Sequence, residues 1–152
     1  MEFRHAEAIM HLMGQTTKMH RHNIDLLIRE HEVFPGQPPL LIHLSKRDGQ
    51  SQKELGERMR ITPATLTVMI NRMQKVGLLK RVPDPSDQRV TRVFLTEKGR
   101  IAADAVHEAL RVTEEASLAG LDEEDKKLLR LLLGKVYNNL EGFAVFNSGD
   151  KN

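Results

Sequence analysis

The sequence predicts an α/β winged helix-turn-helix fold, which is mainly helical with a small β-hairpin wing. Three observations support this prediction. Two capped helical segments lie about three residues apart between Ser51 and Gly77, two strand-like segments follow directly, and amphipathic helices flank both. A pair of helices alone also occurs as an ordinary packing unit, so the hairpin that follows makes the prediction specific.

Residues 3–31 predict one long helix, because apolar and small side chains recur at steps of three and four without a proline. These side chains are Ala6, Ile9, Met10, Met13, Thr17, His20, Ile24 and Leu27. After a proline-rich break, Pro38 and Pro39 suit the first turn of a short helix to about Lys46, where backbone N–H groups are not needed. Asp48–Gly49 then predicts a turn.

The next two helices carry their start signals in the sequence. Ser51 and Glu54 form a capping box, in which the serine hydroxyl accepts the glutamate N–H and the carboxylate reaches back. Thr62 and Pro63 give an N-cap and a first helical residue for the second helix, which Gly77 closes. The side chains expected inside are Leu55 and Met59, then Leu66, Ile70 and Met73, with Met69 at the edge.

A hairpin follows the helix pair directly. Leu78–Pro83 and Val90–Leu95 are rich in β-branched and aromatic residues, and an Asp- and Pro-containing turn separates them. The loop carries Arg89, with Arg81 before it and Arg92 after it. The position of the hairpin predicts a wing.

The last third of the chain predicts two helices. Thr96 caps a helix over residues 97–119, which Gly120 ends, and Asp122 caps a final helix with acidic residues in its first turn. Apolar residues cover more than one side of that final helix: Leu128, Leu129, Leu131, Leu132, Leu133, Val136, Tyr137, Leu140 and Phe143. We therefore expect it to be buried on more than one side, with a partner subunit as the cover.

Composition narrows the class of protein. The 152 residues suffice for one well-packed domain, and the absence of cysteine excludes cysteine zinc sites, thiol nucleophiles and thiol redox sensing. No apolar run is long enough to cross a bilayer, and the polar N-terminus does not resemble a signal peptide. We expect a cytoplasmic protein without membrane contact.

Charge is distributed unevenly. Residues 46–100 hold 13 Lys or Arg against 6 Asp or Glu, whereas the two flanks hold 10 against 15. A basic middle between acidic ends indicates that the middle binds a polyanion. Chance clustering on a solvated surface is the alternative that charge alone leaves open.

Several short motifs together resemble the MarR family of transcriptional regulators. They are Gln52–Gly56, Thr62–Met73, Val76–Arg81, Asp87–Arg89 and Leu95–Gly99. The resemblance implies a homodimer that binds a pseudo-palindromic operator in double-stranded DNA, and repression that a small-molecule effector relieves. It also implies three regions: an N-terminal dimerisation helix (1–36), a winged helix-turn-helix DNA-binding lobe (37–97) and C-terminal dimerisation helices (98–152).

Within that lobe, the outward residues of the second helix and the basic residues of the wing are the candidates for DNA contact. They are Thr62, Ala64, Thr65, Thr67, Val68, Asn71, Arg72, Lys80, Arg81, Asp87, Arg89 and Arg92. We expect Arg89 to enter the minor groove with Asp87 orienting it, and Lys80, Arg81 and Arg92 to contact phosphates. An ordinary turn salt bridge and a solvated strand face are the alternatives. Some relatives have arginine at Val68, so less guanine reading is expected here.

The remaining candidates concern small ligands. The resemblance implies a ligand pocket between the first two helices and the DNA-binding lobe, for which the candidate residues are Met10, Met13, Thr17, His20 and His43. The methionines otherwise suit gap-filling core positions. None of the seven histidines is three or four residues from another, so we expect no metal site on a single helix and no cofactor, although a site assembled across helices stays open.

Two other classes of function were compared with DNA binding. The sequence has no nucleophile–base pair, no phosphate-binding glycine loop and no helical metal motif, so we do not expect an enzyme. A winged helix can also serve as a protein-interaction module without sequence-specific DNA binding. The basic middle would then bind an acidic protein partner.

Overall fold

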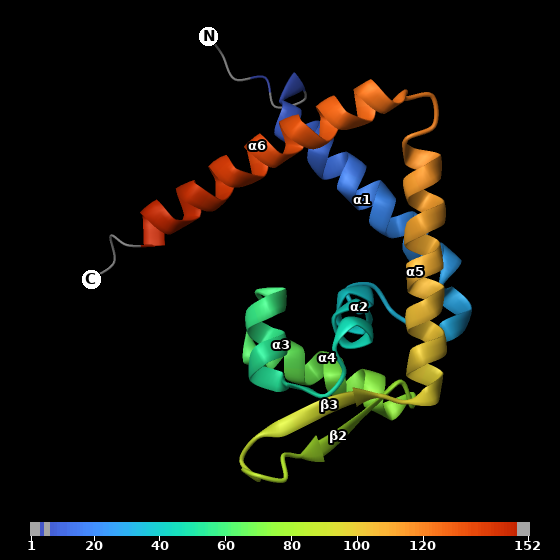
Figure 1. Ribbon diagram of the computed structural model, residues 1–152, viewed down its shortest axis with the longest axis vertical. Helices are drawn as coiled ribbons and strands as arrows, with labels where there is room; N and C mark the ends of the chain where they lie inside the picture. Colours follow the sequence, from blue (N-terminus) through green and yellow to red (C-terminus); the bar gives the residue numbers. More distant parts are fainter. Residues whose placement is uncertain (1–3, 5–6, 149–152) are drawn as a thin grey trace. The chain divides into compact units, whose positions relative to one another are not determined.

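The computed structural model describes residue 4 and residues 7–148, and it divides the chain into two compact units, residues 1–114 and 115–152. The elements in chain order are α1 (Ile9–Leu27), the 3-10 helix η2 (Arg29–His31), α2 (Pro38–Lys46), β1 (Gln50–Ser51), α3 (Gln52–Met59), α4 (Pro63–Lys75), β2 (Leu79–Pro83), β3 (Thr91–Leu95), α5 (Glu97–Ser117) and α6 (Glu123–Ser148). Figure 1 shows a mainly helical chain with one small sheet, as the sequence predicts.

The first helix is shorter than predicted. The described helix begins at Ile9, while residue 3 and Ala6 lie outside the described residues. At the other end the prediction of one helix to residue 31 is wrong, because α1 stops at Leu27 and η2 follows. The change in path brings Ile28 into the core, where it is fully buried. Burial of a side chain of this size is favourable.

The predicted helix-turn-helix is confirmed with its caps. The N–H of Glu54 donates to Ser51 Oγ at 3.1 Å, and the N–H of Ser51 donates to Glu54 Oε2 at 2.8 Å. Thr62 Oγ1 accepts the N–H of Thr65 at 3.2 Å at the start of α4. Each cap satisfies backbone groups that a helix leaves without internal partners. Both helices therefore begin at fixed residues.

The sheet has three antiparallel strands in the order β1-β3-β2. The wing pair is in the expected place, with Leu79 opposite Leu95. The sequence does not predict β1, in which Gln50 pairs with Val93, because two residues are too few to form an alternating pattern. Helices α2, α3 and α4 contact the sheet and lie above it in Figure 1. Strand β1 therefore links the start of α3 to the wing through its pairing with β3.

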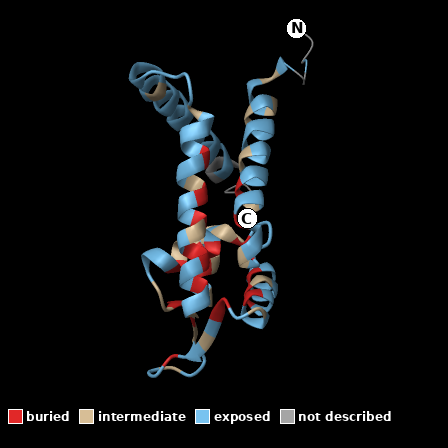
Figure 2. Cartoon of the chain, turned by 90° about the vertical axis from the view of Figure 1, so that its right-hand side faces the viewer, coloured by how far each residue is buried: buried red, intermediate tan, exposed pale blue. Residues whose placement is uncertain are grey.

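One hydrophobic core fills the unit of residues 1–114 (Figure 2). The three residues of α4 predicted to face inward, Leu66, Ile70 and Met73, are all fully buried. Helix α5 adds a stripe of small residues, and its Gly99 lies so close to the sheet that a Cβ there would be 2.0 Å from Leu78 O. The core thus fixes which side of α4 remains outward.

Helix α6 belongs to the second unit. Asp122 Oδ1 accepts the N–H of Asp125 at 2.8 Å, which confirms the predicted cap. None of the side chains described in α6 is buried, and large apolar residues such as Leu131 (56% exposed) face outward. The burial expected on more than one side does not occur within the single chain. Among the described helices, none is long and apolar enough to span a membrane.

Candidate nucleic-acid interface

The outward side of α4 carries the side chains predicted to read DNA. Ala64, Thr65, Thr67, Val68, Asn71 and Arg72 are all exposed. Thr62, at the N-cap, donates its hydroxyl to Thr65 Oγ1 at 2.9 Å and so orders the start of the helix. The structure brings these residues together on one exposed helical side, which is what entry into a major groove requires.

The chemistry of this side is apolar and hydroxylic. Val68 is 50% exposed near the middle of α4 and presents two methyl groups. Residues 63–71 include no lysine or arginine, so Arg72 is the first cation along the helix. Methyl groups can contact thymine methyls, whereas bidentate hydrogen bonding to guanine requires a cationic side chain such as arginine. The face is therefore suited to reading thymine more than guanine.

The wing presents one highly exposed guanidinium. The Arg89 side chain is 91% exposed, and its Nε and Nη2 donate to Asp87 Oδ1 and Oδ2 at 3.0 and 3.2 Å. The backbone N–H of Arg89 also donates to Asp87 Oδ1 at 3.1 Å. The Arg89 guanidinium and this N–H hold the pKa of the Asp87 carboxyl below its usual range. The pair is built within the loop, so the orientation of Arg89 does not depend on other elements.

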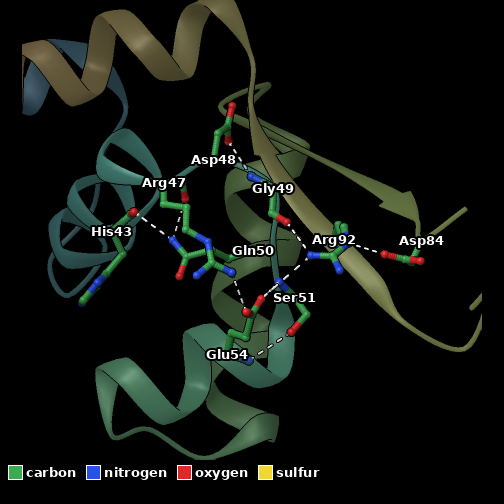
Figure 3. A network of polar contacts seen from close by, with 9 residues as sticks. All are labelled: His43, Arg47, Asp48, Gly49, Gln50, Ser51, Glu54, Asp84 and Arg92. Carbon is green, nitrogen blue, oxygen red and sulfur yellow. Dashed lines mark hydrogen bonds and ion pairs between the residues drawn. The ribbon is translucent and has the colours of Figure 1, made fainter. Parts of the chain in front are cut away.

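Arg92, for which a phosphate contact is predicted, is held by acceptors of its own chain. Its Nε is hydrogen-bonded to Asp84 Oδ2, and its Nη1 donates to the Gly49 carbonyl at 3.0 Å (Figure 3). Glu54 Oε2 lies 3.9 Å from the same Nη1. The guanidinium is thus surrounded by acceptors of its own chain, because β1 and the wing turn lie on either side of β3 here. We assign Arg92 to bracing the wing.

The partner of Arg92, Asp84, organises the wing turn. It is 9% exposed, and its Oδ1 accepts the N–H groups of Ser86 and Asp87 at 2.8 and 3.1 Å. The hydrogen bond from Arg92, followed by the one from the Ser86 N–H, lowers the pKa of Asp84. A single carboxylate therefore shapes the turn and joins it to β3. The sequence pattern suggested a turn here but not this ion pair.

Glu54 links the same network to the first helix of the pair. Its Oε1 accepts from Arg47 Nη2 at 2.6 Å while its Oε2 completes the capping box. The backbone N–H of Ser51 is the main cause of its lowered pKa, and Arg47 adds to it. Buried Gln50 donates its Nε2 to the carbonyls of His43 and Arg47 at 2.9 and 2.6 Å. Figure 3 shows how these residues connect α2, β1 and α3.

The other two basic residues of β2 differ in their surroundings. Lys80 is exposed. Arg81 is half-buried and donates from Nε to Gln52 Oε1 at 3.0 Å and from Nη1 to Gln74 Oε1 at 3.1 Å. Gln52 was noted only as the first residue of the Gln52–Gly56 motif and Gln74 not at all, because no spacing rule joins either glutamine to Arg81.

The five residues predicted for a ligand pocket occupy α1 and α2. Thr17 donates its hydroxyl to the carbonyl of Met13 at 2.9 Å, and His20 Nε2 lies 3.2 Å from Thr113 Oγ1. His43 is half-buried, and burial, followed by Lys46 and Arg58, lowers its pKa. Met10 is 50% exposed. None of the five residues lines the hollow that lies beside α4.

A hollow of about 390 Å³ lies beside α4. The residues lining it are Phe34, Pro35, Gln37, Ala64, Thr65, Val68, Met69 and Arg72. Phe34, which is 58% exposed, comes from the segment between η2 and α2, and its N–H donates to Gln37 Oε1 at 2.9 Å. Four of the lining residues, Ala64, Thr65, Val68 and Arg72, also belong to the DNA-facing set. The hollow therefore opens on the side of α4 that is predicted to meet DNA.

Among the described residues, no group of three or more His, Cys, Asp or Glu side chains is arranged to hold a metal ion. His5 lies outside the described residues.

Comparison with known proteins identifies relatives of the chain. The model of the MarR family matches residues 35–91. The transcriptional regulator PecS of Dickeya dadantii is 32% identical over 120 residues, which cover 77% of this chain and 72% of PecS. This identity and coverage are sufficient to assign a family.

Solved structures give the same fold. A transcriptional repressor, CouR, bound to a 23-mer DNA duplex, aligns with a TM-score of 0.76 at 19% identity, over 90% of this chain and 99% of that one. The PcaV regulator of Streptomyces coelicolor, in complex with its natural ligand, aligns with a TM-score of 0.76 at 23% identity, over 91% and 97%. At these identities the likeness shows the fold alone.

Proposed function

The chain belongs to the MarR family of transcriptional regulators, and on this premise we propose that it is a homodimeric, sequence-specific DNA-binding repressor, released by a small ligand, acting in the cytoplasm. One observation carries the proposal: the exposed, capped α4 and the hydrogen-bonded Asp87–Arg89 pair are presented by the same folded unit. Such a helix and wing suit adjacent grooves of one duplex.

In the proposed complex, α4 lies in the major groove. Ala64 and Val68 contact thymine methyls, and the hydroxyls of Thr62, Thr65 and, at the rim, Thr67 reach base edges or phosphates. Asn71 and Arg72 come later along the helix and contact the DNA backbone. Lys80 and Arg81 on β2 contribute phosphate contacts.

Arg89 then enters the minor groove, where narrow A·T tracts concentrate negative potential. An exposed ion pair such as Arg89–Asp87 contributes little to stability, because solvent screens it. Moving the guanidinium from the carboxylate to the groove therefore costs little. The pair holds Arg89 outward before DNA arrives and releases it easily.

The oligomeric state is proposed from the apolar surface of α6. Its exposed side chains include Leu128 (54%), Leu131 (56%) and Tyr137 (56%), and a helix with such a surface needs a cover. A second copy of the chain supplies one, with residues 1–36 and 98–152 as dimerisation regions and residues 37–97 as the DNA-binding lobe. A twofold dimer would bind a pseudo-palindrome whose half-sites lie about 34–36 Å apart, or a multiple of this.

Ligand release is proposed from the hollow beside α4. A small molecule held among Phe34, Met69 and Arg72 would cover Val68 and Thr65, so that ligand and thymine compete for one surface. This makes the hollow our candidate effector site in place of the five residues predicted from the sequence. That PcaV was solved with its natural ligand supports a ligand-responsive regulator.

The test is selection of binding sites from random double-stranded DNA, followed by affinity measurements on the selected operator at fixed salt. We expect an enriched pseudo-palindrome, and Arg89→Ala should weaken binding at least ten-fold. Arg21→Ala, which removes another exposed cation, from α1, should retain most of the affinity. A protein-interaction module would enrich no sequence. Equal affinity of the Arg89→Ala and Arg21→Ala proteins would refute the wing assignment.

A further inference from the structure

Five of the arginines in residues 1–114 differ in the kind of partner that holds them. Four form an ion pair with a carboxylate: Arg47 with Glu54, Arg89 with Asp87, Arg92 with Asp84 and Arg100 with Asp48. Arg81 is different, because within the described residues its side-chain partners are the amide oxygens of Gln52 and Gln74. The guanidinium of Arg81 is held in place, but its charge is not neutralised.

Three elements hold this guanidinium. Arg81 extends from β2, Gln52 stands at the first residue of α3, and Gln74 is in the last turn of α4. The two hydrogen bonds measure 3.0 and 3.1 Å, and Gln52 Nε2 in turn lies 3.4 Å from Thr67 Oγ1. A guanidinium has five N–H donors in a fixed fork. Two are used here, so the others can meet an anion.

The place of Arg81 indicates which anion it meets. Thr67 and Gln74 are seven residues apart, and so lie on nearly the same side of α4, beside β2. Arg81 is thus set between the recognition helix and the wing. When a helix fills a major groove and a wing fills the adjacent minor groove, the sugar-phosphate backbone that separates the grooves passes between them. Arg81 faces that backbone.

We propose that Gln52 and Gln74 are positioning residues that hold Arg81 as a preformed clamp for one DNA phosphodiester. The inference rests on the proposed function. Ordering a long arginine side chain costs conformational entropy, and the two amides meet that cost before DNA binds. A carboxylate in either place would hold the side chain equally well but would compete with the phosphate. Neutral amides order the side chain without cancelling its charge.

The experiment measures affinity for the selected operator as a function of salt. Arg81→Gln should weaken binding and reduce the log–log salt slope by about 0.9, the value of one phosphate contact. The double variant Gln52→Ala/Gln74→Ala should bind about ten-fold more weakly with the slope of the wild type, because the contact still forms. In the Arg81→Gln background the same two changes should have no further effect. Unfolding midpoints of all variants test that each one folds.

The nearly isosteric substitution Gln74→Glu, at an exposed site, gives a second test. The new carboxylate should pair with Arg81 and weaken binding more than Gln74→Ala does, but only when Arg81 is present. Gln15→Ala, on exposed α1, is the matched control and should bind as the wild type. Losses at Gln52 and Gln74 that persist without Arg81, or no losses at all, would overturn the clamp. If wild type enriches no operator, the proposed function itself fails.

Discussion

Replacing Gly99 by alanine should destabilise the unit of residues 1–114, because the structure leaves no room for one methyl group. A Cβ at this position would lie 2.0 Å from Leu78 O and 3.1 Å from the Leu78 carbonyl carbon. The neighbouring backbone cannot yield freely, since Leu78 O accepts the N–H of Thr96 at 3.1 Å. The N–H of Gly99 itself donates to Thr96 Oγ1 at 3.0 Å. Helix and strand must therefore move apart.

The size of the effect follows from three contributions. Forcing an extra carbon into a well-packed region costs about 1–3 kcal/mol. Loss of the hydrogen bond between Leu78 and Thr96 costs about 1 kcal/mol, whereas alanine gains about 1 kcal/mol over glycine within a helix. The net loss in free energy of unfolding is thus about 2 kcal/mol. Gly99 differs in this from a glycine that merely permits a turn.

The assay is urea unfolding followed by helical circular dichroism at one fixed protein concentration, since a dimer's stability depends on concentration. With a slope of about 2 kcal/mol per molar urea, the midpoint should fall by about 1 M. Gly56→Ala is the matched control in α3, because its Cβ would meet Ile61 O at an ordinary 3.5 Å. Its midpoint should stay level or rise. A Gly99→Ala midpoint equal to that of wild type would refute the steric reasoning.

Three further predictions follow from the network, the last helix and the α4 cap. The pKa of Asp84 is lower in the folded protein, so the stabilisation by its carboxylate is present above the unfolded pKa of about 4 and is lost as pH falls through the folded pKa. Asp84→Asn should therefore reduce the free energy of unfolding at pH 7. It should also make that free energy depend less on acid pH, measured by urea titrations at several pH values. The double variant Leu128→Glu/Leu131→Glu should be a monomer by light scattering, whereas the Lys127→Glu control should remain a dimer. If both proteins are dimers, α6 is not part of the interface. Thr62→Ala should lower the free energy of unfolding by about 1 kcal/mol in thermal melts, and an unchanged melt would show that the cap is not stabilising.

Local backbone signals explain why much of the fold could be predicted. Caps at Ser51 and Thr62 act within three residues, and the pattern of Leu66, Ile70 and Met73 repeats over consecutive turns. Such signals are written in adjacent residues, so a single sequence reveals them. The helices and the wing followed from them, and so did the outward side of α4.

Features set by distant residues could not be predicted. The pairing of Gln50 with Val93 joins segments about forty residues apart, and so does the hydrogen bond from Arg92 to Gly49 O. The wing turn was predicted, but the sequence did not indicate that Asp84 would form an ion pair with Arg92. The end of α1 depends on burial of Ile28, which is a property of the assembled core. Tertiary packing decided each of these cases.

The network of Figure 3 draws its members from α2, the turn before α3, α3, the wing turn and β3, and none of them from α4. Under the proposed function, changes at Ala64 or Val68 would alter the preferred operator without disturbing the ion pairs that orient the wing. Changes at Asp84 or Arg92 have no such freedom, because each needs a matching change in another element. Under the proposed function, binding specificity would diverge on this exposed side of α4, while the supporting charges would have to change in pairs.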